Sequence, residues 1–178
     1  MRKIKTKFKD LIILKSKNNF DFRGHLREIY NDKILNKKFV FDYYSFSRKN
    51  TIRGLHLQTT NPQDKLIIII KGKILDICID LRKNSKTYLK TYKKIISDKD
   101  GTSLFIPKGF AHGFLALSDE NIVLYKNTNY RNKSSELTID IFDDDLYLGL
   151  PKKKYILSKK DNSGMSLKNF RKEYLNEK

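Results

Sequence analysis

The sequence is poor in cysteine and in long apolar stretches, and each scarcity excludes a class of protein. Cys78 is the only cysteine among 178 residues, so the chain forms neither an internal disulfide nor a zinc cage built from several cysteines. The apolar run at 66–70 is far shorter than the roughly 18 residues of a membrane-spanning helix. The basic residues 1–9 precede no signal-peptide pattern, so we expect a cytoplasmic protein without membrane association.

Histidine is also scarce, with three residues in all. Small β-barrels that hold iron or manganese generally use two histidines separated by one residue, together with a carboxylate and a third histidine. The residue two positions after His56 is Gln58, and the sequence contains no His-x-His pair. We therefore expect no catalytic metal and no cofactor.

Positive charge is abundant instead, with a formal net charge of +18 at pH 7. Such a charge attracts phosphates, whether those of nucleic acid or those of a small diphosphate substrate. It is equally typical of a surface simply rich in lysine. The basic residues are spread along the chain, with small clusters such as Lys152–Lys154 and no recognised nucleic-acid motif. We expect no nucleic-acid binding, and the charge alone decides no function.

The spacing of apolar runs predicts a mainly-β fold. Residues 65–70 and 74–80 flank Lys71-Gly72-Lys73, which is typical of a hairpin connection. Short strands separated by turns, with little helical periodicity between them, favour an antiparallel sandwich or barrel. Further strands are expected at 39–45, 88–96, 103–106, 112–117 and 121–126.

The C-terminus has a different pattern. Leu167, Phe170, Tyr174 and Leu175 recur at helical spacing among charged residues, which predicts an amphipathic helix. We therefore expect residues 1–178 to form one domain, with a core over about 20–150 and a helical extension over about 155–178.

His56 has a sequence context suited to a general base. Arg53 lies three residues earlier, and the two side chains share one face of an extended segment if Gly54 permits a bulge. A cation beside an imidazole lowers its pKa and keeps it neutral, as a base must be.

His112 follows the turn at 107–109 and begins a predicted strand, where alternation places Phe114 and Ala116 on its face. On the next predicted strand, Tyr125 is either a core residue with a satisfied hydroxyl or an acid pointing into a cavity.

Two motifs carry a resemblance to a known family: Arg-Gly-Leu-His-Leu-Gln at 53–58 and Pro-Lys-Gly-Phe-Ala-His-Gly-Phe at 107–114. In this order and spacing, with weaker blocks between Asp21 and Asp161, the chain resembles the dTDP-4-dehydrorhamnose 3,5-epimerases, which are RmlC-type cupins. The resemblance implies an antiparallel jelly-roll barrel, a homodimer, and epimerisation of a nucleotide-diphosphate sugar used in polysaccharide biosynthesis.

The chemistry of that family assigns roles to five residues. A base removes a proton next to the keto group, the resulting enolate oxygen needs positive or donor groups, and an acid on the opposite ring face inverts the centre. The resemblance implies that His56 is the base and that Asp161 pairs with it. It assigns Lys65 and His112 to the enolate oxygen, and Tyr125 to the acid.

The resemblance also implies a set of residues that bind the substrate, the arginines among them chiefly through its phosphates. These residues are Arg23, Glu28, Arg53, Gln58, Asp76, Tyr130, Arg131, Glu136 and Lys160.

The departures from the family pattern lie near the nucleotide end and the cavity wall. Phe41 and Tyr43 replace the usual Gln and Asn, and Arg131 replaces the second tyrosine of a pair that stacks on the base. These differences leave open a GDP- or UDP-linked sugar, a heptose, inversion at C3 alone, or the related 3,4-ketoisomerase chemistry.

Overall fold

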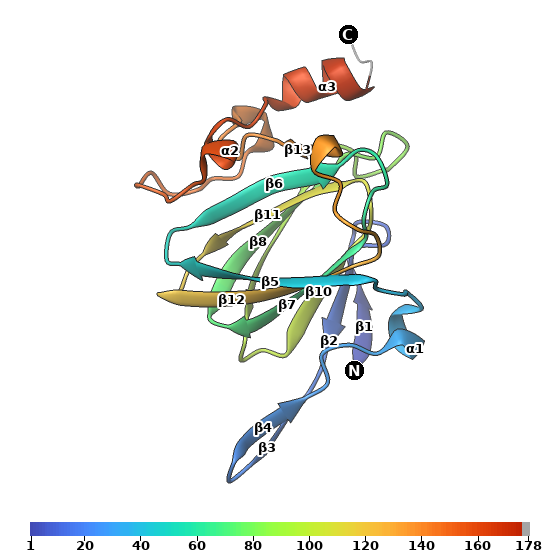
Figure 1. Cartoon of the computed structure of the whole chain (residues 1–178), viewed down its shortest axis with the longest axis vertical. Helices are drawn as coiled ribbons and strands as arrows, with labels where there is room; N and C mark the ends of the chain where they lie inside the picture. The colour runs from blue at the N-terminus through green and yellow to red at the C-terminus, as the bar shows by residue number, and fades with distance from the viewer. Residues whose placement is uncertain (176–178) are drawn as a thin grey trace.

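A computed structural model describes residues 1–175. The described chain forms two antiparallel β-sheets packed face to face, with a small separate hairpin projecting from one end and the C-terminal segment at the other (Figure 1). The predicted mainly-β fold is confirmed.

The first sheet supplies one wall of the space between the sheets. Its strands, in spatial order, are β1 (Arg2–Lys5), β2 (Ile12–Lys15), β10 (Thr102–Ile106), β7 (Lys65–Lys71), β12 (Glu120–Asn127) and β5 (Phe41–Arg48).

The second sheet supplies the opposite wall. Its strands, in spatial order, are β13 (Glu136–Thr138), β6 (Ile52–Gln58), β11 (Phe110–Ala116), β8 (Lys73–Asp80) and β9 (Thr91–Ser97). The separate hairpin consists of β3 (Asn18–Asp21) and β4 (Gly24–Arg27). The helices are α1 (Asp32–Leu35), α2 (Lys159–Asn162) and α3 (Leu167–Leu175), with 3-10 turns at Lys133–Ser135 and Asp144–Leu146.

The predicted strands and the C-terminal helix occur in the structure, with shifted ends. The strand expected over 88–96 begins only at Thr91, because residues 81–90 form a loop fixed by side-chain hydrogen bonds. Strands β1, β2, β3, β4 and β13 escaped prediction: each is only three or four residues long, and β1, β3 and β4 are mostly exposed and show no apolar alternation. Residues 176–178 of the expected helical extension lie outside the described residues.

The space between the sheets contains one apolar cluster, and the outer face of the second sheet contains another. Cys78 is fully buried in the first cluster, as expected of a small core residue. The second cluster joins β6, β8 and β11 to the C-terminal segment through Leu167 and Phe170. Burial of such side chains stabilises the fold by about 1.5–3 kcal/mol each. This packing carries α2 to the edge of β6.

The core also extends beyond the expected span of about 20–150. Leu11 and Leu14, near the N-terminus, are buried at 0% and 1% exposure, and Leu167 and Phe170 at 3% and 2%. Strand β2 pairs with β10 and β1 pairs with β2, which neither composition nor local periodicity indicates.

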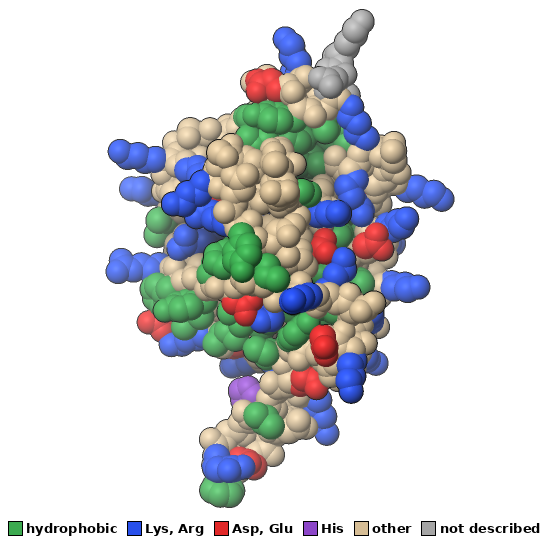
Figure 2. Space-filling view, turned by 45° about the vertical axis from the view of Figure 1, so that its right-hand side comes forward, with side chains coloured by type: hydrophobic (Ala, Val, Ile, Leu, Met, Phe, Trp, Pro, Cys, Tyr) green, Lys and Arg blue, Asp and Glu red, His purple; other side chains and the backbone are tan. Residues whose placement is uncertain are grey.

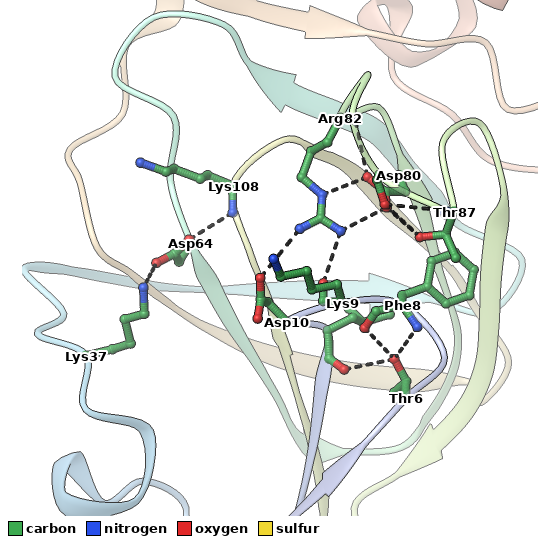
Figure 3. A network of polar contacts seen from close by, with 12 residues as sticks. Thr6, Phe8, Lys9, Asp10, Lys37, Asp64, Asp80, Arg82, Thr87 and Lys108 are labelled. Carbon is green, nitrogen blue, oxygen red and sulfur yellow. Dashed lines mark hydrogen bonds and ion pairs between the residues drawn. The ribbon is translucent and has the colours of Figure 1, made fainter.

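A polar network fixes the loop after β8 against the N-terminal segment (Figure 3). The Arg82 guanidinium donates to the Asp80 carboxylate at 2.8 Å and to the Lys9 carbonyl at 3.0 Å. The Ser85 and Thr87 hydroxyls also donate to Asp80. Burial raises the pKa of Asp80, but these donors outweigh it, so the pKa lies below its usual 3.8.

The β3–β4 hairpin extends away from the body of the molecule with apolar side chains near its tip (Figures 1 and 2). Phe20, Phe22 and Leu26 are 74%, 98% and 76% exposed. The base of the hairpin is held, because Arg27 donates to the carbonyls of Asp98 and Ile69. No helix among the described residues is long and apolar enough to cross a membrane.

Candidate active site

A cavity of about 400 Å³ lies between the two sheets. Strands β5, β7 and β12 of the first sheet form one wall, and β6 and β11 of the second sheet form the other. Its lining consists of Phe41, Tyr43, Ser45, Arg53, His56, Lys65, His112, Gly113, Phe114, Tyr125, Arg131, Glu136 and Asp161.

A bulge in β6 places Arg53 and His56 on the same wall. His56 pairs with His112 and Arg53 with Phe114, so two residues of β6 lie opposite the single Gly113 of β11. Gly54 has φ +108°, and a Cβ there would lie 2.6 Å from the His112 carbonyl oxygen, so only glycine fits. The conditional prediction that Gly54 permits a shared face agrees with this geometry.

His56 and Asp161 form a hydrogen-bonded dyad. The His56 Nε2 lies 2.5 Å from Asp161 Oδ1, although 105 residues separate them in sequence. The Ser158 hydroxyl donates to Asp161 Oδ2 at 2.8 Å, and the Gly54 amide donates to Oδ1 at 3.3 Å. Burial raises the pKa of Asp161, but the contacts with His56 and Ser158 outweigh it and hold the pKa below its usual 3.8.

Glu136 is the centre of a charged cluster beside this dyad. Its carboxylate accepts from Arg131 at 2.7 Å and pairs with the Lys160 ammonium at 2.9 Å. The other ring nitrogen of His56, Nδ1, lies 4.0 Å from Glu136. The cluster therefore gathers three predicted substrate-binding residues at one edge of the cavity and leaves Nδ1 without a close hydrogen-bond partner in the described contacts.

Lys65 and His112 approach the cavity from opposite sheets. Burial lowers the pKa of the Lys65 ammonium below its usual 10.5. His112 is held from behind, because its Nε2 lies 2.8 Å from Oδ2 of the fully buried Asp76. Asp76 is thus a support for His112 and does not line the cavity.

Tyr125 occupies the wall opposite the His56 dyad. It lies on β12 with 6% exposure, and its ring centroid is 6.4 Å from that of His112. Burial raises the pKa of the phenol well above 10, so it stays protonated. The cavity therefore has an imidazole with a carboxylate partner on one sheet and a protonated phenol on the facing sheet, so a proton can leave one side of a carbon and another can arrive from the opposite side.

Comparisons with known proteins agree with this chemistry. The family model described as dTDP-4-dehydrorhamnose 3,5-epimerase matches residues 5–169. The chain belongs to this family. The epimerase of Methanothermobacter thermautotrophicus is 40% identical, with 94% of this chain and 95% of that protein covered. The Escherichia coli epimerase is 37% identical, with 90% of this chain and 91% of that protein covered.

Solved structures show the same fold as this epimerase. A Bacillus anthracis dTDP-4-dehydrorhamnose 3,5-epimerase with TDP and pyrophosphate bound has a TM-score of 0.89 and 37% identity, over 93% of this chain and 99% of that one. A Legionella pneumophila enzyme in complex with dTDP-4-keto-L-rhamnose has a TM-score of 0.89 and 33% identity, over 94% of this chain and 93% of that one. The present chain is accordingly an isomerase, a nucleotide-sugar 3,5-epimerase with the jelly-roll cupin fold.

Besides Asp76 and Lys160, four more of the predicted substrate-binding residues do not line this cavity of the epimerase. Gln58 bonds through its amide to the backbone of residues 60, 61 and 132, so it orders two loops instead. Tyr130 is 71% exposed and contacts Phe41 at the mouth. Arg23 lies on the projecting hairpin and pairs with Asp21, while Glu28 lies 3.8 Å from the N-terminal amine.

Two further features escaped the sequence analysis. Ser45 lines the cavity, and its hydroxyl is buried. Ser158, which orients Asp161, also caps α2, because its hydroxyl accepts from the Asp161 amide at 3.1 Å. A serine three residues before an acidic residue at the start of a short helix is a signal that predicts the cap. No local signal indicates Ser45.

Within residues 1–175, one group has donor atoms close enough to hold a metal ion: Asp76, Cys78 and His112. In the structure these donors bond to one another, since the Cys78 thiol donates to Asp76 at 3.4 Å and His112 contacts the other carboxylate oxygen. Burial, with Asp76 as a smaller cause, raises the pKa of the Cys78 thiol, which disfavours the thiolate that a metal needs. We interpret the group as the support of His112.

Proposed function

We propose that this epimerase inverts C3 and C5 of a dTDP-linked 4-keto-6-deoxy sugar. The observation that carries the proposal is the placement of the His56–Asp161 dyad and the Tyr125 phenol on facing sheets. The dTDP-linked substrates named for its relatives support thymidine as the base. The family also supports a role in supplying sugars for polysaccharides.

His56 acts as the base through Nδ1. Nε2–H of His56 donates a hydrogen bond to the Asp161 carboxylate, which fixes the tautomer and leaves a lone pair on Nδ1. When Nδ1 takes the proton from the carbon next to the keto group, the ring becomes an imidazolium, and the anionic Asp161 stabilises that charge. The low pKa of Asp161 keeps it anionic at neutral pH.

Lys65 and His112 stabilise the enolate oxygen formed in this step. An oxyanion is stabilised most by donors that are already in place inside a cavity with little water. The Lys65 ammonium and the His112 ring approach from two sheets, so the oxygen has a donor on either side. These donors support a reaction that needs no metal ion, and activity is expected to survive EDTA.

Tyr125 returns a proton to the carbon from the opposite face and completes the inversion. The C–H bond forms as the phenolic O–H bond breaks; solvent then returns a proton to the phenolate and takes one from the His56 imidazolium, so the enzyme is restored. Arg53, Arg131 and Lys160 supply positive charge for the diphosphate at the cavity edge.

The active form is a homodimer in which the β3–β4 hairpin of one copy reaches the cavity of the other. The exposed Phe20, Phe22 and Leu26 support this arrangement, because a lone chain leaves that apolar surface in water. It would also bring Arg23 and Glu28 to a substrate. Phe22→Asp is expected to weaken the dimer in sedimentation velocity and to raise KM, whereas a fully active monomer would exclude the arrangement.

Deuterium exchange tests the proposed reaction. The protein is incubated in D2O with dTDP-, GDP- and UDP-4-keto-6-deoxy sugars, and NMR follows loss of the C3 and C5 protons. We expect exchange and inversion at both carbons of the dTDP sugar. A preference for GDP or UDP would overturn the base assignment, exchange at C3 alone would overturn the double inversion, and no exchange with any sugar would overturn the function.

A further inference from the structure

The acid wall contains a second tyrosine that the proposed mechanism does not use. Tyr43 on the edge strand β5 pairs directly with Tyr125 on β12. The two rings stack, with centroids 4.6 Å apart and an interplanar angle of 14°. The contact is the closest to parallel among the ring pairs of the described residues. Both rings line the cavity.

The stack forms part of an aromatic row that runs outward along the wall. Phe41 lies 5.5 Å from Tyr43, and Tyr130 lies 6.2 Å from Phe41 (centroid distances). Tyr125 at the inner end of this row is 6% exposed, Tyr43 is 40% exposed and Tyr130 at the outer end is 71% exposed, while Phe41 is partly buried. Tyr43 therefore lies between the buried phenol and the open end of the cavity.

The base and the acid differ in how their rings are restrained. His56 is oriented by a short hydrogen bond to Asp161. For Tyr125, the hydrogen-bonding group that acts on the phenol is the neutral Ser45 hydroxyl, and no carboxylate bonds to it among the described residues. A ring without such a bond is oriented by its packing, and the parallel face of Tyr43 supplies packing on the side of the cavity.

We propose that Tyr43 is a positioning residue, which holds the Tyr125 ring so that its hydroxyl faces the substrate from the side opposite His56. The proposal rests on the proposed function, because it assumes that Tyr125 is the acid. Its consequence is a control of stereochemistry: Tyr43 sets the fraction of enolates that receive a proton with inversion.

The two fates of the enolate make this control measurable. If the Tyr125 hydroxyl gives its proton, the new C–H bond forms on the face opposite the one attacked, and the centre inverts. If the imidazolium of His56 gives a proton back, the original configuration returns. Because the His56 proton can exchange with D2O first, that return leaves deuterium without inversion. A misplaced Tyr125 ring therefore lowers inversion more than exchange.

Tyr43→Leu tests the role, because it removes the ring and keeps an apolar side chain. The ratio of inversion to exchange is expected to fall about threefold to tenfold, with KM little changed, since an aromatic stack contributes about that factor. Tyr43→Phe keeps the stack and is expected to restore the ratio. Tyr44→Leu is the matched control, because Tyr44 is the next residue on β5 and is 70% exposed.

Three results would overturn the proposal: equal losses of inversion and exchange in Tyr43→Leu, a rise in KM alone, or failure of Tyr43→Phe to restore the ratio. NMR of the ring protons of Tyr125, assigned with Tyr125→Phe, gives a readout that needs no substrate. Loss of the stack is expected to shift these protons in Tyr43→Leu and not in Tyr44→Leu. Unchanged ring signals would overturn the positioning role even if the wild-type protein showed no exchange and the proposed function itself had failed.

Discussion

The two walls of the cavity hold their reactive groups by different physical means. On the wall of β6 and β11, His56 is held by hydrogen bonds and charge, through Asp161 and with Glu136 nearby. On the wall of β5 and β12, Tyr125 is held by burial and by a stacked ring. Epimerisation needs an unprotonated base and a protonated acid at the same pH.

The two environments shift the pKa values of Asp161 and Tyr125 in opposite directions. The donors around Asp161 lower its pKa, which keeps an anion beside His56 and fixes the proton on Nε2. Burial disfavours a phenolate and raises the pKa of Tyr125. The comparison teaches that polar contacts orient the proposed base on one wall and that burial keeps the proposed acid protonated on the other, and variants can test each wall separately.

His56→Asn should have the largest effect, because it removes the base itself. Exchange of the substrate protons into D2O is expected to fall by at least about 10³-fold. NMR in D2O measures the exchange, and thermal unfolding checks that the variant folds. Exchange at more than a tenth of the wild-type rate would assign the base to another residue.

Asp161→Asn alters the same wall at the residue that holds His56. The amide cannot stabilise the imidazolium and favours the wrong tautomer, so exchange is expected to fall about 10²-fold to 10³-fold. Ser163→Ala is the matched control on the end of α2, where the hydroxyl bonds only to backbone carbonyls. If Asp161→Asn and Ser163→Ala lose equal activity, the dyad has no special role.

Tyr125→Phe tests the acid wall alone. Exchange is expected to stay within a few-fold of wild type, whereas net inversion falls about 10²-fold, because the base still works and the acid is gone. NMR separates the two rates. Tyr92→Phe, which alters a phenol on β9 that does not line the cavity, is the control. Normal inversion by Tyr125→Phe would remove Tyr125 from the mechanism.

The pH dependence of the exchange rate tests Lys65, whose substitution is expected to have the smallest effect at neutral pH. Burial lowers its pKa below 10.5, and the charged form stabilises the enolate, so the exchange rate should fall as the pH rises through that lowered pKa. Tyr125, whose pKa burial raises, stays protonated in this range. Lys65→Arg keeps its charge and is expected to lose the alkaline decline, at about a tenfold lower rate at pH 7. A decline that persists unchanged in Lys65→Arg would belong to another group.

Much of the fold and part of the site could be predicted from local patterns. The β7–β8 hairpin follows from two apolar runs around Gly72, and α3 follows from the helical spacing of Leu167 and Phe170. The motifs around His56 and His112 carry the family resemblance, because catalytic residues and their neighbouring turns are contiguous there. The strands β1 and β3 could not be predicted, since exposed strands show no apolar alternation.

Local sequence patterns could not predict which residues far apart in the sequence lie close together in the fold. Ser45 reaches the cavity because β5 pairs with β12, and the Gln58 amide is held by loop carbonyls. Neither outcome has a signature in the neighbouring residues. The separation of Arg23 and Glu28 from the cavity likewise depends on where the hairpin projects (Figure 1).

The sequence by itself determined the chemical groups available: three histidines, one cysteine, a mainly-β pattern and two ordered motifs that indicate an epimerase. The tertiary structure decided which groups meet. Asp161 reaches His56 only because Leu167 and Phe170 pack the C-terminal segment onto the outside of the second sheet. Burial between the sheets then gives Tyr125 its high pKa, an effect of surroundings that no single segment contains.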